Sequence, residues 1–413
     1  MTNTSVRIRR LRASATAMAA AAVLAGGGSV VPAAAAAAAA PSATAPLTAE
    51  QLRQEVERAL RDGGFVGLSV EVRDGRHRSR AQAGEAELGT GREVPAGASL
   101  RAGSATKPFV ATVVLQLAAE GRLSLDDTVE QWLPGVVTGN GNDGSRITIR
   151  NLLQQTSGIH NYDYADDVGD DAAAFEEHRF DQVSPWQLVA GAMGSAPDFP
   201  PAAPGDPAPD WGYSNPNYIL AGLIIQRVTG QDWATAVTER IIEPLGLAGT
   251  YAPGDDPSLP EPYLHTYHHF AGAPEWTDTT IRSMSWADAA GALVTTERDL
   301  DRFFTALLDG RLLPPRELAE MRDTVPVDPD FEIAFPGLTY GLGLMREPLS
   351  CGGHRWGHGG DLAGATVREG VTEDGRRSIV INASGKTEDD EQLLRAEAAL
   401  RQLMDTVLCR GTR

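Results

Sequence analysis

Residues 104–120 read SATKPFVATVVLQLAAE, a short polar turn followed by a long apolar run. The run from Pro108 to Glu120 has helical length and carries small or apolar side chains nearly all round, which predicts a buried helix. At the start of a helix, a spacing of three places Ser104 and Lys107 on one face. Because a buried helix holds its first turn rigidly, we expect the fold to be built around this stretch.

The Ser104 and Lys107 pair has a chemistry that other residue types would not supply. Of 36 basic residues in the chain, only Lys107 and Lys386 are lysines. A serine hydroxyl is a weak nucleophile until a base removes its proton, and a desolvated lysine can act as that base whereas an arginine cannot. Helix N-terminal N–H groups can also stabilise an oxyanion. Taken alone, the pair could equally be a capping serine beside a surface lysine.

Two further motifs follow in the chain. At 213–215 the sequence is YSN, and in an extended chain Tyr213 and Asn215 would point the same way. Tyrosine can act as a general acid or base, and an asparagine amide can bind a substrate carbonyl. At 358–360 the sequence is HGG after a strand-like run, where two glycines allow a substrate backbone to approach a sheet edge. By itself, HGG would fit a turn with a solvent-exposed histidine.

Together, S-x-x-K, Y-x-N and H-x-G in this order resemble the signature of the serine penicillin-recognising enzymes, which include D-alanyl-D-alanine carboxypeptidases and class C β-lactamases. The H-x-G form resembles the soluble actinobacterial D-alanyl-D-alanine carboxypeptidases, whose sisters are D-aminopeptidases and related esterases. Stretches such as RLSLDDTVEQWLP and YSNPNYILAGLIIQRVTG are also similar to that family. The resemblance runs from about residue 50 to residue 409, nearly the whole mature chain.

The resemblance implies a catalytic role for each motif residue. Ser104 would be the acylated nucleophile, and Lys107 and Tyr213 would handle the protons, although which of the two is the acylation base is open. Asn215 would orient the substrate. His358 could help to hold the proton network.

The resemblance also implies how a substrate is bound. The backbone N–H groups of Ser104 and Asp361 would form the oxyanion hole, with Gly359 and Gly360 beside it on the strand edge. Trp286 lies where carboxypeptidases of the family place an aromatic wall. The expected ligands are small peptides, peptidoglycan fragments or β-lactams, and no cofactor is expected.

Three positions depart from the carboxypeptidase pattern, in which an arginine and threonines hold the terminal carboxylate of the substrate. Met345 stands at the arginine position, Gly359 at a threonine position, and Asp361 follows the motif. Arg346 is adjacent, but a shift of one residue in a strand turns the side chain to the other face. We expect Asp361 to repel a carboxylate and to favour an ammonium group or a neutral leaving group.

These observations leave several functions open. The main prediction is a serine hydrolase that forms an acyl-enzyme on peptides containing D-residues, with D-alanyl-D-alanine carboxypeptidase-like activity. The alternative is a D-aminopeptidase, D-amino-acid amidase or esterase of the same family. A true β-lactamase is less favoured because His358 replaces the lysine usual in class C. A non-catalytic penicillin-binding or peptidoglycan-binding sensor is the alternative of another class.

The ends and the charge of the chain indicate where it acts. Residues 1–40 combine four arginines, an apolar run and an alanine tract, which is typical of a secretory signal peptide of a bacterial extracellular protein rather than of a membrane anchor. The formal net charge of −19 argues against nucleic acid as a partner. We expect a monomer.

The cysteines and the remaining pattern predict the architecture. Cys351 and Cys409 are the only cysteines, so an exported chain is expected to pair them in a disulfide. Helices at both ends around antiparallel strands predict an α+β fold with an all-helical insertion. The expected domains are an α/β sheet domain, 45–130 and 275–413, and a mainly helical domain, 131–274. The histidines at 265, 268 and 269 lack the spacing of a metal site, so no metal is expected.

Overall fold

The computed structural model describes residues 46–162 and 171–410. The predicted signal peptide, 1–40, lies outside the described residues. Within the described ranges, no helix combines the length and the apolar character needed to cross a bilayer.

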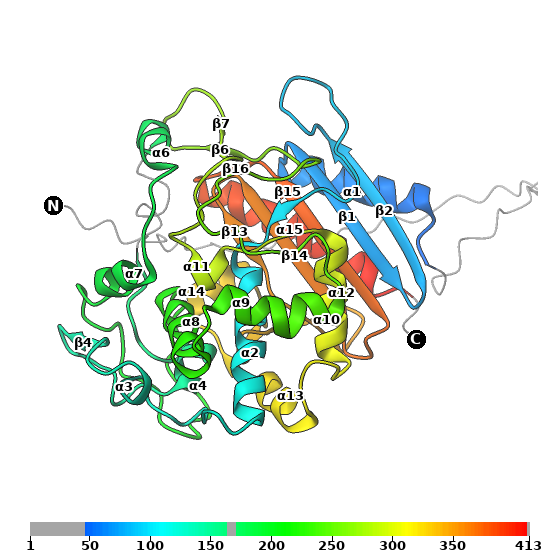
Figure 1. Ribbon diagram of the computed structural model, residues 1–413. Coiled ribbons are helices and arrows are strands. Elements are labelled where there is room, and N and C mark those ends of the chain that lie inside the picture. Colours follow the sequence, from blue (N-terminus) through cyan, green and yellow to red (C-terminus); the bar gives the residue numbers. More distant parts are fainter. Residues whose placement is uncertain (1–45, 163–170, 411–413) are drawn as a thin grey trace, which may run out of the picture. The chain divides into compact units, whose positions relative to one another are not determined.

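An antiparallel sheet is the largest element of the described chain (Figure 1). Its nine described strands run in the order β2-β1-β15-β14-β12-β11-β10-β9, with β13 also pairing with β14. Their bounds are β1 Gly67–Asp74, β2 His77–Gly84, β9 Val325–Pro326, β10 Thr339–Tyr340, β11 Met345–Pro348, β12 His354–Gly357, β13 Gly360–Leu362, β14 Ala365–Thr372 and β15 Arg377–Ser384.

Both faces of this sheet are covered by helices. On one face, α1 (Ala49–Gly63) and α15 (Asp390–Leu408) pack against each other and against the sheet. Successive residues of a strand point to opposite faces, so Ile379 and Ile381 of β15 belong to the core with α1 and α15, whereas Val380 belongs to the core on the other side. There α12 (Glu297–Leu308) lies on β15 and β14. The sequence-based prediction of terminal helices around an antiparallel sheet is confirmed.

The apolar run that opened the sequence analysis forms α2 (Lys107–Ala119), and ten of its residues are buried. This confirms the predicted buried helix. Its Phe109 ring stacks on Phe303 of α12 at a centroid distance of 3.5 Å. It also packs against α8 (Pro216–Thr229), which is buried from Pro216 to Ile225. The first turn of α2 is therefore held between α12, which lies on the sheet, and α8.

The regular elements between residues 131 and 274 are mainly helices joined by long loops, and they also include the short β4–β5 pair and β6. The division into two domains near 130 and 275 stays a prediction. The elements of this segment and of its surroundings have the following bounds: α3 Val129–Trp132, β4 Thr138–Gly139, β5 Asn142–Asp143, α4 Ile149–Gln154, α6 Ala172–His178, α7 Pro185–Ala192, α9 Trp233–Val237, a π-helical turn Thr238–Ile242, α10 Glu243–Leu245 and β6 Tyr267–His269. The other short elements are β3 Leu100–Arg101, the 3-10 turn η1 Gly103–Thr106, β7 Thr277–Asp278, α11 Asp288–Gly291, β8 Val294–Thr295, α13 Pro315–Arg322, α14 Pro329–Ala334 and β16 Lys386–Thr387.

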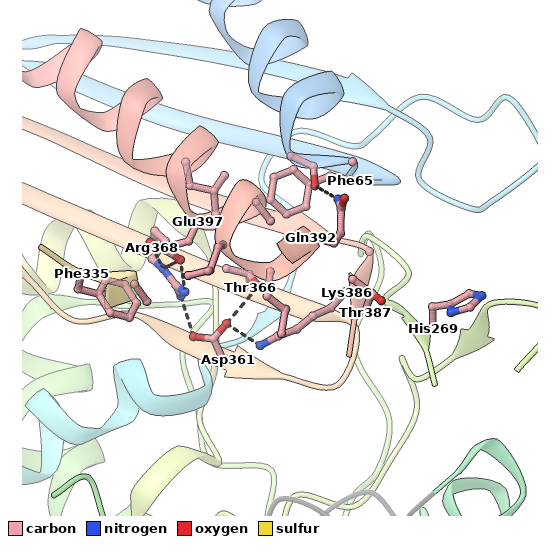
Figure 2. Close-up of a pocket in the computed structure, with 18 of the residues that line it drawn as sticks. Phe65, His269, Phe335, Asp361, Thr366, Arg368, Lys386, Thr387, Gln392 and Glu397 are labelled. Carbon is pink, nitrogen blue, oxygen red and sulfur yellow. Dashed lines mark hydrogen bonds and ion pairs between the residues drawn. The ribbon is translucent and has the colours of Figure 1, made fainter. Parts of the chain in front are cut away.

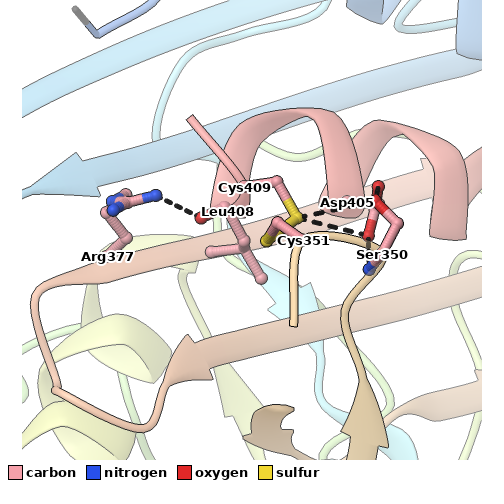
Figure 3. Close-up of a disulfide and its surroundings, with 6 residues drawn as sticks. All are labelled: Ser350, Cys351, Arg377, Asp405, Leu408 and Cys409. Atoms are coloured by element: carbon pink, nitrogen blue, oxygen red, sulfur yellow. Dashed lines mark hydrogen bonds between the residues drawn. A yellow bond between two sulfur atoms is a disulfide. The ribbon is translucent and has the colours of Figure 1, made fainter. Parts of the chain in front are cut away.

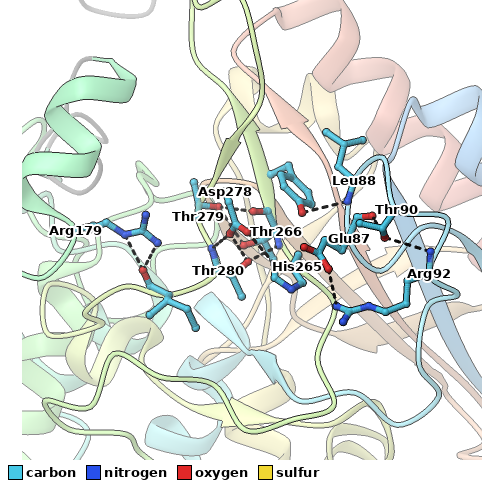
Figure 4. Close-up of polar contacts among 12 residues, drawn as sticks. Glu87, Leu88, Thr90, Arg92, Arg179, His265, Thr266, Asp278, Thr279 and Thr280 are labelled. Atoms are coloured by element: carbon cyan, nitrogen blue, oxygen red, sulfur yellow. Dashed lines mark hydrogen bonds and ion pairs between the residues drawn. The ribbon is translucent and has the colours of Figure 1, made fainter.

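The β6–β7 hairpin is tied to neighbouring loops by polar contacts (Figure 4). His265 Nδ1 lies 2.8 Å from a carboxylate oxygen of Asp278, and the Tyr267 hydroxyl accepts a hydrogen bond from the Leu88 backbone N–H at 3.1 Å. On its other side, β6 pairs in parallel with β16, which begins at Lys386. The hairpin therefore fixes the backbone position of one of the two lysines of the chain.

The predicted disulfide joins Cys351 and Cys409, with a Cα–Cα distance of 5.6 Å (Figure 3). It links the turn after β11 to the end of α15. Asp405 of α15 reinforces the link, because its carboxylate accepts a hydrogen bond from the Ser350 backbone N–H at 2.8 Å. The last helix is thus fastened to the sheet at its C-terminal end.

We expect the double substitution Cys351→Ser with Cys409→Ser to lower the free energy of unfolding by about 3–4 kcal/mol, because the bond closes a long loop in the unfolded chain. The two residues are separated by 58 positions. Equilibrium urea unfolding of the oxidised protein and the variant measures the difference. Reduction of the unmodified protein should reproduce the loss. Equal unfolding midpoints would contradict the expectation.

Candidate active site

The amine of Lys107 lies at the centre of the predicted site. The side chain is completely buried. Its Nζ lies 3.0 Å from Ser104 Oγ, 2.7 Å from Asn215 Oδ1 and 2.8 Å from the Ala290 carbonyl oxygen. These oxygens come from η1, from the residue that precedes α8, and from α11. One amine therefore joins three elements that are distant in the sequence.

The three oxygens suit both protonation states of the Lys107 amine. As an ammonium, it donates a proton to each of them. As a neutral amine, it has two N–H groups for the Asn215 and Ala290 oxygens, which can only accept, and a lone pair that faces the Ser104 hydroxyl. The hydroxyl proton can therefore pass to Nζ without rearrangement of the other two hydrogen bonds.

Tyr213 lies against the same pair. Its ring centroid is 4.8 Å from Lys107 Nζ. Burial raises the pKa of Tyr213 well above its ordinary value; Tyr340 adds to the shift, and the nearby Ser104 hydroxyl opposes it. Tyr213 is therefore a neutral phenol near pH 7, with a proton that it can donate.

The loop that carries Tyr213 and Asn215 is held by side chains from earlier in the chain. Gln155 has a left-handed backbone (φ 65°), and its Oε1 accepts from the Ser214 N–H at 3.0 Å. Asn161 Oδ1 accepts from the Asn215 N–H at 2.9 Å. The expected extended geometry is wrong at Asn215, which has helical dihedrals (φ −63°, ψ −40°) and directly precedes α8.

Two glycines allow β13 to lie directly against the turn of Ser104. Gly103 has φ +52°, and a Cβ there would lie 3.2 Å from the Asp361 nitrogen. A Cβ on Gly360 would lie 2.0 Å from the Ala102 carbonyl oxygen and 3.3 Å from the Ser104 nitrogen. Side chains are therefore excluded from this junction. The backbone nitrogens of Ser104 and Asp361 lie at the same junction.

His358 is buried beside the site and has partners of its own. Its Nδ1 lies 2.7 Å from the Gly359 carbonyl oxygen, so Nδ1 carries the proton, and Nε2 accepts from the Tyr340 hydroxyl at 2.9 Å. Burial, followed by the charge of Lys107, lowers the pKa of His358 to about 3. His358 is thus a neutral imidazole that fixes the end of β12. Its role in holding the proton network stays a prediction, and the hydrogen bonds of its ring go to Tyr340 and Gly359.

A cavity of about 290 Å³ opens above the Ser104 hydroxyl. It is lined by most of the residues that the sequence singled out, namely Ser104, Tyr213, Asn215, Trp286, His358, Gly359 and Asp361. Lys107 lies beneath this lining. The volume suits a small amino-acid derivative.

Asp361 is not the isolated negative charge that the sequence suggested. Its carboxylate lies 2.8 Å from Lys386 Nζ and 2.9 Å from Arg368 Nη1 (Figure 2). Burial would raise the pKa of Asp361, but Arg368 and Lys386 outweigh it and hold the pKa well below its ordinary value. Arg368 also pairs with Glu397 at 2.6 Å. The expected repulsion of a substrate carboxylate by Asp361 is therefore wrong, because the charge is compensated.

The other departures behave as the strand pattern predicts. Met345 and Glu347, two residues apart on β11, both line the cavity. Arg346 points to the opposite face, where it bonds His354 at 2.9 Å, so it does not replace the missing cation. Arg355 lines the cavity too, but it is paired with Glu347 at 2.7 Å. Each described cation that lines this cavity therefore has a carboxylate partner.

Comparison with known proteins places this geometry in a family. The family model described as Beta-lactamase matches residues 52–403. The chain belongs to the Beta-lactamase family. It is a serine hydrolase of the β-lactamase fold.

Among the relatives of this Beta-lactamase family member are enzymes that act on amides. A D-stereospecific amidohydrolase from Streptomyces sp. is 42% identical, with a TM-score of 0.74; the match covers 85% of this chain and 98% of that one. The D-amino acid amidase of Ochrobactrum anthropi SV3, solved with L-phenylalanine amide, is 26% identical with a TM-score of 0.72, over 86% and 98% of the chains. A putative penicillin-binding protein, PbpX, of Bacillus subtilis is 25% identical over 82% of this chain and 76% of its own length.

Several residues of this site were missed by the motif analysis. Phe331, Phe335, Arg368 and Lys386 line the cavity, and Asn161 positions Asn215. The sequence held a signal for Lys386, because it is the only lysine of the chain besides Lys107. Phe331 on α14 and Phe335 just after this helix carried no such signal in the sequence.

Proposed function

We propose that this protein is a serine-type amidohydrolase that cleaves amides and peptides of D-amino acids through an acyl-Ser104 intermediate. One observation carries the choice: each described cation that lines the cavity is already paired with a carboxylate. A substrate with a free terminal carboxylate would find no uncommitted cation there. The likeness to a D-stereospecific amidohydrolase and to a D-amino acid amidase supports the same substrate class.

Acylation follows from the contacts around Ser104. Its Oγ attacks the substrate carbonyl carbon while the hydroxyl proton passes to Lys107 Nζ, 3.0 Å away. The carbonyl oxygen becomes an oxyanion that the N–H groups of Ser104 and Asp361 stabilise. Asn215 orients the acyl part. The C–N bond then breaks, and the leaving nitrogen takes a proton from Tyr213, which recovers one from Lys107.

Deacylation uses the same groups in the opposite direction. A water molecule attacks the ester of Ser104 and gives its proton to the Lys107 and Tyr213 pair, and Ser104 Oγ is released with a proton. Since the phenol of Tyr213 has a raised pKa, Lys107 rather than Tyr213 is the first acceptor in this scheme. The scheme needs both groups, which weighs against a purely ligand-binding sensor.

We place the protein outside the cytoplasm. The Cys351–Cys409 disulfide fits an oxidising compartment, and the N-terminal 40 residues have the pattern of an export signal. The monomeric state stays a prediction.

If Ser104 is the nucleophile, it should be the only residue labelled covalently by a β-lactam or an alkyl phosphonate. Intact-protein and peptide mass spectrometry should find a single adduct in the unmodified protein and none in Ser104→Ala. Ser258→Ala removes an exposed hydroxyl elsewhere and serves as the control that keeps the adduct. An adduct that persists in Ser104→Ala would refute the assignment.

Lys107→Arg should slow acylation by at least about a hundredfold, because a guanidinium keeps the charge but does not release a proton near neutral pH. Single-turnover kinetics with a chromogenic amide measure the acylation rate directly. A circular dichroism melt shows whether the variant is folded. Near-normal acylation in a folded variant would leave Lys107 with a structural role only.

The unmodified enzyme should prefer D-alanyl-D-alanine amide to the free acid by about tenfold to a hundredfold in kcat/KM, the range of one lost charge-assisted hydrogen bond. Asp361→Asn should narrow the ratio, because Lys386 and Arg368 then lose a carboxylate partner. The exposed Asp206→Asn is the matched control and should leave the ratio unchanged. A tenfold preference of the unmodified enzyme for the acid would overturn the substrate class.

A further inference from the structure

A second cavity of about 470 Å³ adjoins the one above Ser104. Phe335, Asp361, Arg368 and Lys386 line both cavities, so the ion pairs of Asp361 form their shared boundary (Figure 2). The Asp361 side chain is 41% exposed, and solvent therefore reaches this boundary. We call the second space the side cavity.

The walls of the side cavity are largely apolar. They include aromatic and aliphatic side chains from the end of α1, from the β6–β7 hairpin and from α15, among them Phe65, Trp276, Leu393, Leu394 and Leu400. Several polar groups in the wall are engaged with protein partners: Gln392 donates to the Gly63 carbonyl at 2.7 Å, and Glu397 pairs with Arg368. The side cavity thus offers apolar contact rather than a site for a charged group.

Apolar side chains also remain uncovered at its rim. Leu394 of α15 lines the side cavity and is 42% exposed. Ile333 of α14 is 49% exposed and directly precedes Ala334 and Phe335, which line the side cavity. Exposed large apolar residues gathered at a hollow are typical of a ligand-binding surface.

A row of aromatic rings connects the proton donor to the side cavity. The Tyr213 ring stacks on Phe331 at a centroid distance of 5.9 Å, and Phe331 stacks on Phe335 at 5.0 Å. Phe335 is the ring that lines both cavities. Since the leaving nitrogen takes its proton at Tyr213, the part of the substrate attached to that nitrogen lies along this row.

We propose that the side cavity binds the leaving-group half of the substrate and selects amines that carry an aromatic or a branched aliphatic group. This inference rests on the proposed amidohydrolase function and adds a specificity to it. The neutral boundary at Asp361 and Lys386 supplies hydrogen-bond partners for the polar atoms that cross it. The apolar end of the leaving group lies among Phe65, Trp276 and Leu394.

The test compares D-alanine 2-phenylethylamide with D-alanine methylamide, which share the acyl group and differ only in the leaving amine. We expect kcat/KM to be about tenfold to a hundredfold higher for the phenylethylamide, the gain expected from burying one aromatic group. The parameter kcat/KM reports the steps up to acylation, whereas the deacylation rate should be the same for both substrates.

Two variants test whether the side cavity is responsible. Trp276→Ala should reduce the ratio of the two kcat/KM values towards one, and Leu394→Gln, at a partly exposed position that tolerates a polar group, should reduce it too. Trp186→Ala removes a tryptophan that is 50% exposed on α7, away from both cavities, and should leave the ratio and the basal rate unchanged.

Four results would overturn the inference. A ratio near one in the unmodified protein, with the methylamide still hydrolysed, would refute the side cavity as a subsite and leave the proposed function intact. A high ratio that persists in both Trp276→Ala and Leu394→Gln would place the leaving group elsewhere. If instead D-phenylalanine methylamide gains over D-alanine methylamide in a way that Trp276→Ala removes, the side cavity serves the acyl group. Failure to hydrolyse any of these amides would refute the proposed function as well.

Discussion

The fold around the site depends on the burial of one amine, that of Lys107. A buried charge without partners costs several kcal/mol, so the chain must bring acceptors to it. They come from η1, from the residue before α8 and from α11, a short helix whose last carbonyls have no partner within the helix itself. The same contacts place the Ser104 hydroxyl and the Asn215 amide on either side of one cavity. The hydrogen bonds that the buried Lys107 amine requires are therefore the same contacts that assemble the site.

Much of the fold could be predicted from local patterns. The apolar run after Ser104 gave a helix that is buried on all sides, and the strand alternation on β11 correctly excluded Arg346 from the cavity. Local rules failed at Asn215. A residue before proline is biased towards extended conformations, yet Asn215 is helical because Asn161 holds its N–H and Lys107 holds its amide oxygen. The failure coincides with the site, where tertiary contacts override local preference.

The charges of the site could not be predicted in the same way. Asp361 reads as an unopposed acid because its partners Arg368 and Lys386 are recognisable only when the pairings of β13 with β14 and of β16 with β6 are known. Those pairings lie in two different sheets, and β16 and β6 are distant in the sequence. The hydrogen-bond partner of His358 could not be predicted either, since Tyr340 comes from β10, two strands away from β12 across the sheet.

The ion pairs of Asp361 with Arg368 and Lys386 affect both the oxyanion and the binding of a substrate carboxylate. The backbone N–H of Asp361 lies at the junction with Ser104, where an oxyanion would develop. A carboxylate and an oxyanion about 5 Å apart would repel each other by about 3 kcal/mol at an effective dielectric constant of 20. An unpaired carboxylate there would oppose the reaction that the backbone supports. Arg368 and Lys386 remove this repulsion, but in doing so they are no longer free to hold the carboxylate of a substrate. In the proposed mechanism, pairing the acid beside the oxyanion hole therefore favours neutral leaving groups, and the adjoining apolar walls suit the same kind of group.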